Sequence, residues 1–308
     1  MESVVVALGG NAILRAKDTG TDEEQFANVR RTCSHIVRLI SEGYRVTITH
    51  GGGPQIGNIV IRNEVAVENV PSMPLDICTA ESLGMIGYIV QNSLANALRA
   101  TRVEKTVLSV ITQAIVDRAD PAFRHPSKPI GPFFTREEAM KLRRQMGLTM
   151  MEDAGRGYRR AVPSPDPKAI VEIEAVRKLI QSDVVTICSP YLPVVERGGQ
   201  LERVQAVLDK DLASERLASG IGADVLLILT DVEKVAVNYG KSDQKDLDHI
   251  TVAEAEEFLR QGHFAPGSMQ PKVKAAARFV KAGGKRASIS SLDRAYDSMK
   301  GNAGTTIS

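Results

Sequence analysis

Apolar and polar positions follow one another in blocks that predict strands and helices in turn. Residues 3–8, SVVVAL, form an almost unbroken apolar run, which is typical of a strand buried on both faces. Residues 22–42 carry apolar side chains about every 3.6 positions, which predicts a helix, and Gly43 is a common residue for ending one. Residues 44–53 predict a second strand that runs into glycines, and residues 56–66 the start of a second helix.

The same alternation continues to the end of the chain, with one long interruption. Before it, we expect a helix over residues 79–99 and a strand over 105–112. After it, we expect a hairpin turn and a strand within 198–211, helices over 169–181, 212–219, 252–261 and 271–282, and strands over 183–189, 223–232 and 286–291. Repeated strand–helix units favour a mainly parallel sheet with helices on both faces. The predicted fold class is α/β, a three-layer αβα sandwich.

The interruption spans residues 116–162 and breaks the regular pattern. It is rich in proline, glycine and charged residues, as in DRADPAFRHPSKPIGPFF, and contains one short helical pattern over 135–145. Irregular segments of this length inside a compact domain are usually functional loops or lids. We therefore expect residues 116–162 to form an insertion or lid outside the main sheet.

Composition narrows the class of protein. Hydrophobic residues make up 43% of the 308 positions, but aromatic residues only 4%, and tryptophan is absent, so the core must be aliphatic. The formal net charge is +2, which gives no reason to expect nucleic acid or a membrane surface as a partner. No apolar run reaches the roughly 18 residues that a spanning helix needs.

The three cysteines, Cys33, Cys78 and Cys188, lie far apart and match no metal-ligand spacing. Their odd number also argues against a disulfide framework. The chain enters a strand pattern at once, without a basic leader segment. We expect a soluble, cytoplasmic protein in a reducing compartment and no protein-bound metal.

Two glycine loops follow the first two predicted strands. Gly9, Gly10 and Asn11 come after the first strand, and Gly51, Gly52 and Gly53 after the second. Ligands of open α/β sheets bind beyond the carboxyl ends of the strands, where backbone N–H groups and helix N-termini cradle anions. Either loop alone is equally consistent with a tight turn, but two on neighbouring strands favour a phosphate site. Neither matches the P-loop or the dinucleotide fingerprint.

Three lysines occupy positions that fix where their charge points. Lys128 lies between prolines in SKPIGPF, Lys210 lies in DKD after a predicted strand, and Lys272 opens a helix after GSMQP. Phosphoryl transfer needs such point charges on the migrating group and little covalent chemistry from the protein. The flanking Asp209 and Asp211 either orient the lysine or cap the following helix. The pattern leaves both open.

The strand LLILTDV ends in Thr230 and Asp231, which suits a nucleotide contact but is explained almost as well by a plain turn. None of the five histidines has a metal partner nearby in sequence, and none is assigned as a general base. His50 at a strand end is interpreted as structural.

Together, these motifs resemble the carbamate kinases of the amino acid kinase family. The resemblance covers essentially the whole chain and rests on ALGGNA, HGGGPQIG, SLGMIGY, KPIGPF, VPSPDP, AVLDKDLAS, LLILTDV, HFAPGSMQPKV and the terminal AGT, in that order. It implies an open, mainly parallel sheet between helices and reversible phosphoryl transfer between ATP and carbamate, giving ADP and carbamoyl phosphate. Residues 1–205 would form the carbamate lobe, including the lid at 116–162, and residues 206–308 the nucleotide lobe. A homodimer is also implied.

The resemblance further implies roles for individual residues. Lys210 and Lys272 would stabilise the transferring phosphoryl group, Lys128 would reach in from the lid, and Asp209 would organise the lysines. The glycine loops with Asn11 would supply neutral donors, and Mg²⁺ would be held mainly through the phosphates of ATP or ADP. The implied nucleotide contacts are Thr230, Asp231, Val232, Tyr239, Ser268 and Met269. Carbamate is already an oxyanion, so its attack needs no general base, which agrees with the absence of an assigned one.

Several positions depart from the family pattern, and all are expected on the active-site face. Gly52 stands where HGNGPQ usually has asparagine, and the segment from Ser189 to Leu192, SPYL, replaces a run of glycines. Gln270 replaces a glycine, and Asp166 stands where a basic residue is usual. Ala236 takes the place of a tyrosine, with Tyr239 nearby.

These changes lead to the hypothesis that the fold and nucleotide binding persist while carbamate kinase activity is weakened or redirected. The leading interpretation is a working carbamate kinase. The alternatives are a kinase of the same fold for another small carboxylate or carbamate-like anion, and a weakly active or inactive nucleotide-binding homologue.

Overall fold

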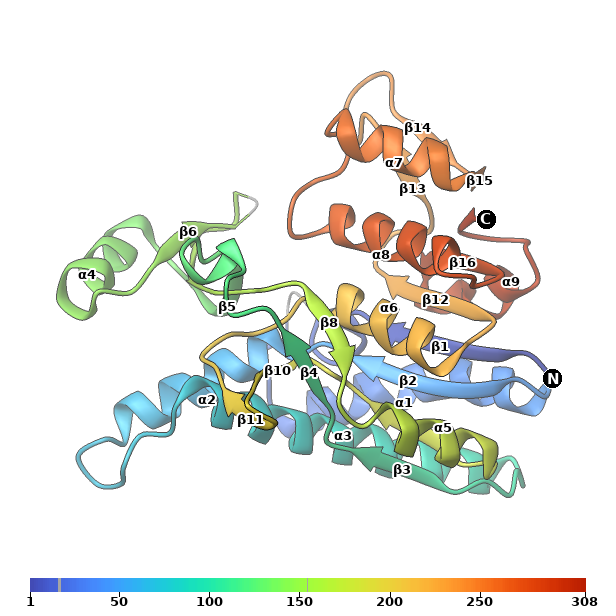
Figure 1. The fold of residues 1–308 in the computed structure, drawn as a ribbon, viewed down its shortest axis with the longest axis horizontal. Helices are drawn as coiled ribbons and strands as arrows, with labels where there is room; N and C mark the ends of the chain where they lie inside the picture. The colour runs from blue at the N-terminus through green and yellow to red at the C-terminus, as the bar shows by residue number, and fades with distance from the viewer. Residues whose placement is uncertain (16–17, 154) are drawn as a thin grey trace.

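A computed structural model describes residues 1–15, 18–153 and 155–308, and its centre is an eight-stranded sheet (Figure 1). Neighbouring strands are parallel except for the pair β16–β17. The order across the sheet is β15 (His249–Ile250), β17 (Thr305–Ile307), β16 (Arg286–Ser291), β12 (Val225–Thr230), β1 (Ser3–Leu8), β2 (Arg45–His50), β9 (Val185–Cys188) and β3 (Val107–Val110). The α/β class and the mainly parallel sheet are thus confirmed.

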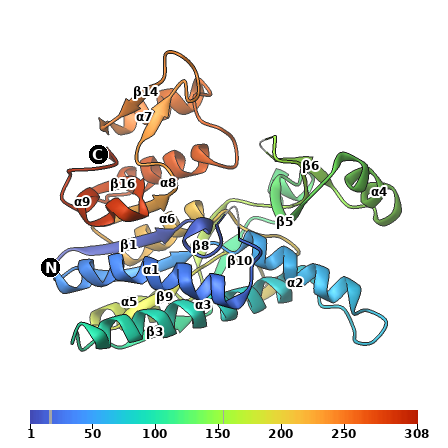
Figure 2. The same ribbon diagram turned by 180° about the vertical axis from the view of Figure 1, so that it is seen from behind.

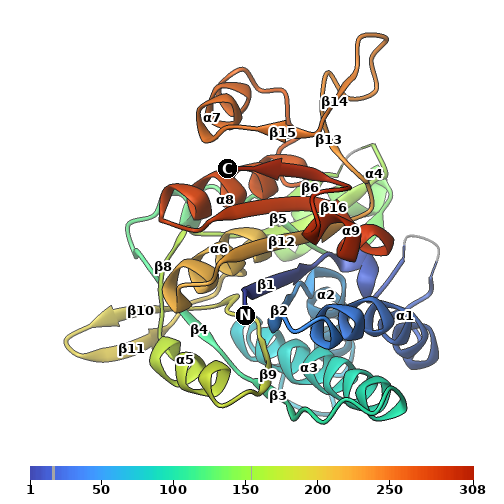
Figure 3. The same cartoon turned by 90° about the vertical axis from the view of Figure 1, so that its right-hand side faces the viewer.

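Helices cover both faces of this sheet (Figure 3). The alternation of side chains along β1 explains this arrangement. Val4 and Val6 point to one face and join the core formed with α1 (Asp22–Ser41), α3 (Leu75–Ala100) and α9 (Ala295–Met299). Val5 and Ala7 point to the other face, where the core includes residues of α6 (Lys210–Ile221), α7 (Val252–Arg260) and α8 (Met269–Lys281). All four are buried, as an apolar strand between two helical layers requires.

Part of the predicted insertion projects from the body of the molecule (Figures 1 and 2). It consists of the sheet β5-β7-β6, from β5 (Lys128–Phe134), β6 (Met150–Glu152) and β7 (Tyr158–Val162), together with α4 (Arg136–Met146). Helix α4 begins at a capping box between Thr135 and Glu138, so the short predicted helix is confirmed. This segment packs against α2 (Gly53–Val65) through β5.

A second sheet, in the order β11-β10-β4-β8, connects the projecting segment to the main body. Its strands are β4 (Gln113–Val116), β8 (Pro167–Ile170), β10 (Leu192–Arg197) and β11 (Gln200–Arg203). A small hairpin of β13 (Val235–Val237) and β14 (Lys245–Leu247) lies near α7. No helix in the described ranges is long and apolar enough to cross a membrane.

Some predicted boundaries were wrong. The helix expected over 169–181 begins only at Ile173, as α5 (Ile173–Gln181), because the preceding residues form β8. Helices α2 and α3 begin three and four residues earlier than expected, at Gly53 and Leu75. Strand β10 and the short helix α9 were not predicted. The hairpin turn is confirmed, with Gly198 and Gly199 both at positive φ between β10 and β11.

Candidate active site

The carboxyl ends of β1, β2 and β12 lie side by side at one edge of the main sheet. Leu8 is opposite His50 on one side and Leu229 on the other, so the chain leaves all three strands at the same level. Both glycine loops and Thr230 therefore meet at this edge. This is the juxtaposition that the sequence predicts for an open α/β sheet.

The first glycine loop is pressed against β12. The backbone N–H of Gly9 donates to the carbonyl oxygen of Leu229 at 3.0 Å, and a β-carbon on Gly9 would lie only 2.8 Å from that oxygen. Only glycine permits this approach. Gly10 and Asn11 are exposed and begin a single 3₁₀ turn, Gly10–Ala12, directly after β1.

The three predicted lysines come together around two carboxylates. Lys128 Nζ donates to Asp209 Oδ2 at 2.6 Å. Lys210 Nζ donates to Asp211 Oδ1 at 2.5 Å, and Lys272 Nζ donates to Asp211 Oδ2 at 3.0 Å. Three ammonium groups therefore gather at the edge of the sheet where ligands bind, an arrangement suited to an anionic ligand.

Burial sets the electrostatics of this cluster. Desolvation, with repulsion from Lys272, lowers the pKa of Lys210 despite its carboxylate neighbours. Desolvation acts in the same direction on Lys272, but the Asp211 carboxylate outweighs it and raises the pKa of Lys272. For Asp211, burial alone would raise the pKa, but Lys210 and Lys272 together hold it well below its usual range. Asp211 is therefore ionised and shared between two lysines.

Asp209 caps the following helix and also binds a lysine, although this lysine is Lys128 and not the neighbouring Lys210. Its Oδ1 accepts the backbone N–H of Asp211 at 2.9 Å and caps α6, while its Oδ2 binds Lys128. The first turn of α6 is also tied to β2, because Ser214 Oγ donates to the carbonyl oxygen of Lys210 and lies 2.6 Å from Thr49 Oγ1. These contacts fix Lys210 relative to the second glycine loop.

The contacts to Lys210 and Lys272 are made by Asp211, whereas the resemblance gave the organising role to Asp209. Asp211 is 2% exposed and is the functional candidate that sequence reasoning left out of the site. The signal was present in the DKD motif. Nothing in the sequence, however, placed Lys272 within reach of the second aspartate, since the two residues are 61 positions apart.

The second glycine loop lies between the lysine cluster and a buried tyrosine. A β-carbon on Gly51 would lie 3.1 Å from Cδ of Lys210, so the lysine stem passes directly over this residue. A β-carbon on Gly52 would lie 2.6 Å from the hydroxyl oxygen of Tyr191. Gly53 is partly exposed and begins α2, whose N-terminus faces the same edge.

The residues predicted to contact a nucleotide divide into two groups. Thr230 ends β12, and Asp231 and Val232 follow it. The Asp231 carboxylate lies close enough to contribute to the raised pKa of Lys272. Ser268 and Met269 start α8, one turn before Lys272. Tyr239 follows β13 and is 68% exposed, and no hydrogen bond joins it to the lysine cluster within the described part of the chain.

Comparison with known proteins agrees with this geometry. The model of the amino acid kinase family matches residues 2–291. The chain belongs to the amino acid kinase family. It is 49% identical to the carbamate kinase of Thermococcus kodakarensis, an alignment that covers 100% of this chain and 99% of that protein.

Solved structures of Giardia lamblia carbamate kinase are similar to this amino acid kinase over 99% of its length and 98% of theirs. The structure bound to citric acid is 41% identical, with a TM-score of 0.95. The structure bound to AMP-PNP is 42% identical, with a TM-score of 0.91. The predicted family and three-layer fold are thereby confirmed.

Asp166 is an acidic residue at a position where the family resemblance leads us to expect a basic one. Its carboxylate forms an ion pair with Arg278. Its carboxylate accepts two hydrogen bonds from Arg278 on α8, at 2.8 and 2.6 Å, and its pKa is lowered because these bonds outweigh the effect of burial. Its backbone N–H donates to Asp120 Oδ2 at 2.9 Å. Asp166 thus links the base of the projecting segment to the helix that carries Lys272.

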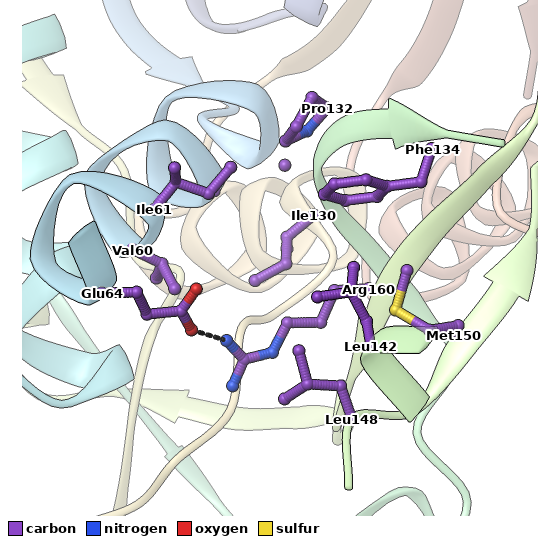
Figure 4. Close-up of a pocket in the computed structure, with 12 residues that line it drawn as sticks. Val60, Ile61, Glu64, Ile130, Pro132, Phe134, Leu142, Leu148, Met150 and Arg160 are labelled. Carbon is purple, nitrogen blue, oxygen red and sulfur yellow. Dashed lines mark hydrogen bonds and ion pairs between the residues drawn. The ribbon is translucent and has the colours of Figure 1, made fainter. Parts of the chain in front are cut away.

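A groove with about 370 Å³ of space, partly open to solvent, lies at the root of the projecting segment (Figure 4). It is lined mostly by apolar side chains of α2 and of the projecting segment, and an ion pair of 3.1 Å between Arg160 and Glu64 crosses one side. It contains none of the three lysines. Within residues 1–15, 18–153 and 155–308, no group of three His, Cys, Asp or Glu side chains could hold a metal ion.

Proposed function

We propose that this chain is a carbamate kinase, which transfers a phosphoryl group reversibly between ATP and carbamate to give ADP and carbamoyl phosphate. The observation that carries the proposal is the partly buried cluster of Lys128, Lys210 and Lys272 beside two glycine loops. Positive charge and backbone N–H donors meet there, at one edge of the sheet. The high identity to carbamate kinases over the full chain supports the same assignment.

The proposed chemistry needs no proton transfer. A carbamate oxygen forms a bond to the γ-phosphorus of ATP while the bond from that phosphorus to the β–γ bridging oxygen breaks, and ADP leaves with the electron pair. Lys210 and Lys272 face the charge that develops on the transferring group, and Lys128 approaches from the projecting segment. Asp211 keeps both ammonium groups in place, and the second glycine loop aligns the carbamate.

We assign the nucleotide to the lobe of residues 206–308, beside Thr230, Asp231, Val232, Ser268 and Met269. The AMP-PNP complex of the Giardia lamblia carbamate kinase supports nucleotide use by this fold. We further propose that Mg²⁺ arrives on the nucleotide phosphates, because the described residues supply no cage of acidic side chains. Tyr239, which follows β13 in the small hairpin, is a further proposed contact of the nucleotide.

The remaining assignments follow the same family. We propose that residues 1–205 form the carbamate lobe, that residues 116–162 close over it as a lid, and that the protein acts as a cytoplasmic homodimer. The projection of β5, β6, β7 and α4 from the body supports the lid assignment (Figure 1). Small-molecule substrates are the only other partners in this proposal.

Two of the departures from the family pattern, Tyr191 and Asp166, make no polar contact with the three lysines of the site in the part of the chain that the structure describes. Tyr191 is buried behind Gly52, and Asp166 is occupied by Arg278. Neither residue contacts Lys128, Lys210 or Lys272 by an ion pair or hydrogen bond within the described residues. A working enzyme is therefore favoured over an inactive homologue. A kinase for another small carboxylate is the alternative if carbamoyl phosphate is not a substrate.

The deciding experiment measures ATP formation from ADP and carbamoyl phosphate. We expect turnover by the wild type and a loss of about 10²–10³-fold in kcat for Lys210→Ala, the effect of removing one charge-stabilising donor. Lys281→Ala is a matched control, because this lysine of α8 is 66% exposed and, among the described residues, pairs with Glu256 alone. Wild-type ADP binding without turnover would contradict the assignment of carbamate, and a screen of small carboxylates would then identify the acceptor.

A further inference from the structure

Two departures from the family pattern, Gly52 and Tyr191, touch each other. A β-carbon on Gly52 would lie 2.6 Å from Tyr191 Oη, 2.6 Å from Ser82 Oγ and 3.1 Å from Cδ1 of Ile86. Real β-carbons essentially never approach another heavy atom that closely. Tyr191 is 2% exposed and Ser82 is fully buried. The tyrosine hydroxyl thus fills the space that a side chain at position 52 would need.

The segment that carries Tyr191 is attached to the glycine loop at two further points. Ser189 Oγ accepts the backbone N–H of His50 at 2.8 Å. The rings of His50 and Tyr191 pack edge to face, with centroids 5.9 Å apart and an interplanar angle of 79°. The residue before the loop and the middle of the loop are therefore both held by the segment that replaces the family's glycine run.

The neighbouring loop residue, Gly51, lies against Lys210, whose stem would be 3.1 Å from a β-carbon on Gly51. Residue 51 is therefore packed against the Lys210 stem and residue 52 against the Tyr191 hydroxyl. The hydroxyl groups of Tyr191 and Ser82 are buried beside each other, and hydrogen bonding with Ser82 partly offsets the rise that burial causes in the pKa of Tyr191. Neither hydroxyl bonds to the glycine loop within the described residues, so their contribution to the loop is to occupy space.

We propose that Tyr191 is a positioning residue, which holds the second glycine loop against Lys210 so that its backbone N–H groups meet the carbamoyl phosphate anion. The substitutions at positions 52 and 191 then depend on each other. Tyr191 occupies the volume that a side chain at position 52 would need, so only glycine fits there. The effect on turnover rests on the proposed function, whereas the packing between residues 52 and 191 is independent of that function.

The first test separates positioning from general stability. We expect Tyr191→Ala to raise KM for carbamoyl phosphate about tenfold or more while KM for ADP changes less than about twofold, because a displaced loop misaligns only the substrate that it binds. Tyr191→Phe, which keeps the ring, should retain both KM values. Leu94→Ala is the control for lost core packing, since Leu94 is fully buried in α3. Equal changes in both KM values, or the same selective change in Leu94→Ala, would overturn the proposal.

The second test needs no turnover. Gly52→Ala is compared in the wild type and in a Tyr191→Phe, Ser82→Ala background that lacks the two obstructing oxygens. We expect Gly52→Ala to lower Tm by several degrees in the wild type and by clearly less in the altered background. Equal losses of Tm in the two backgrounds would overturn the coupling. If the wild type forms no ATP, the proposed function fails, and this comparison still decides whether Tyr191 restricts position 52.

Discussion

The candidate site has two walls that are built on opposite principles. The charged wall comprises Lys128, Asp209, Lys210, Asp211 and Lys272, and ion pairs inside the protein hold it in place. The glycine wall comprises residues 50–57 with Tyr191, and close packing holds it in place. The charged wall depends on ion-pair partners that must be present, whereas the glycine wall depends on the absence of side chains at its glycine positions.

This difference predicts different ways for each wall to fail. A buried charge that loses its partner is left uncompensated, so the charged wall should respond most strongly to neutral substitutions of the same shape. A backbone held by packing should respond to added volume instead, even when no polar group changes. Variants that alter only charge or only volume therefore test the two walls separately.

The largest effect is expected for Asp211→Asn, which keeps the shape of the side chain but removes the charge shared by Lys210 and Lys272. Breaking such a buried pair from one side costs about 3–5 kcal/mol of unfolding free energy. The two lysines also lose their fixed positions, so kcat for ATP formation should fall about 10²-fold or more. Urea denaturation and the ATP assay measure the two effects.

Asp248→Asn is the matched control for this substitution. Asp248 also pairs with a lysine, Lys234, but its side chain is 80% exposed, so its removal should change stability by less than about 1 kcal/mol. Comparable losses for Asp211→Asn and Asp248→Asn would show that the charged wall is not held by buried pairing.

The pH dependence of stability tests how tightly the glycine wall is packed, because His50 lies buried in this wall. Burial lowers the pKa of His50 from 6.5 to about 4. Between these values, the unfolded chain binds a proton that the folded chain does not, so stability is lost as the pH falls from about 6.5 towards 4. The linkage relation gives a loss of roughly 2–3 kcal/mol by pH 4.5 from this group.

The measurement is the free energy of unfolding in urea at several pH values, for the wild type and for His50→Gln. The carboxylates contribute equally to both proteins, so the difference isolates His50. We expect the variant to lose less stability between pH 6.5 and 4.5. Parallel curves would mean that His50 is accessible to protons in the folded state, and the packing around the loop would have to be looser than described.

The sequence predicts the charged wall and the glycine wall to different extents. Lys128, Lys210 and Lys272 are recognisable because turn residues or helix starts fix their positions, and the structure brings them together. Asp211 was underestimated because its second partner is distant in sequence. For the glycine wall, residue types marked the loop, but they gave no sign that Gly52 packs against Tyr191.

Only the structure shows what replaces the missing side chain at position 52. Tyr191 belongs to a different strand end and lies 139 positions further along the chain, so no local pattern relates the two residues. The same holds for Asp166, whose partner Arg278 lies on another helix. Local signals predict where backbone and charge are needed, whereas compensation between distant substitutions depends on three-dimensional packing.

The fold shows the same limit. Strands with continuous apolar runs, such as β1 and β12, and helices with clear periodicity, such as α1, were predicted from their own residues. Strands β8 and β10 were not predicted, because their pairing with β4 in a small separate sheet gives them their structure. Strand β8 has only four residues, which carry too little periodicity to be distinguished from the start of a helix.

The smallest effect concerns volume at the far end of the glycine wall. Gly57 in α2 faces Gly131 in β5, and a β-carbon on Gly57 would lie 1.8 Å from Cα of Gly131. Gly57→Ala must therefore push the projecting segment away from α2, at a cost of about 1–3 kcal/mol. Since Lys128 begins β5, we also expect its ion pair with Asp209 to weaken and kcat to fall.

Gly84→Ala supplies the matched control, because Gly84 also lies inside a helix, α3, and a β-carbon there would meet no atom within 4 Å. Alanine should raise the stability at this position by about 0.5–1 kcal/mol through its higher helix propensity. Opposite signs for the two glycine-to-alanine changes would show that space, rather than backbone flexibility, demands glycine at position 57. A stabilising Gly57→Ala with unchanged kcat would mean that the projecting segment moves without disturbing Lys128, and the two walls would then be mechanically independent.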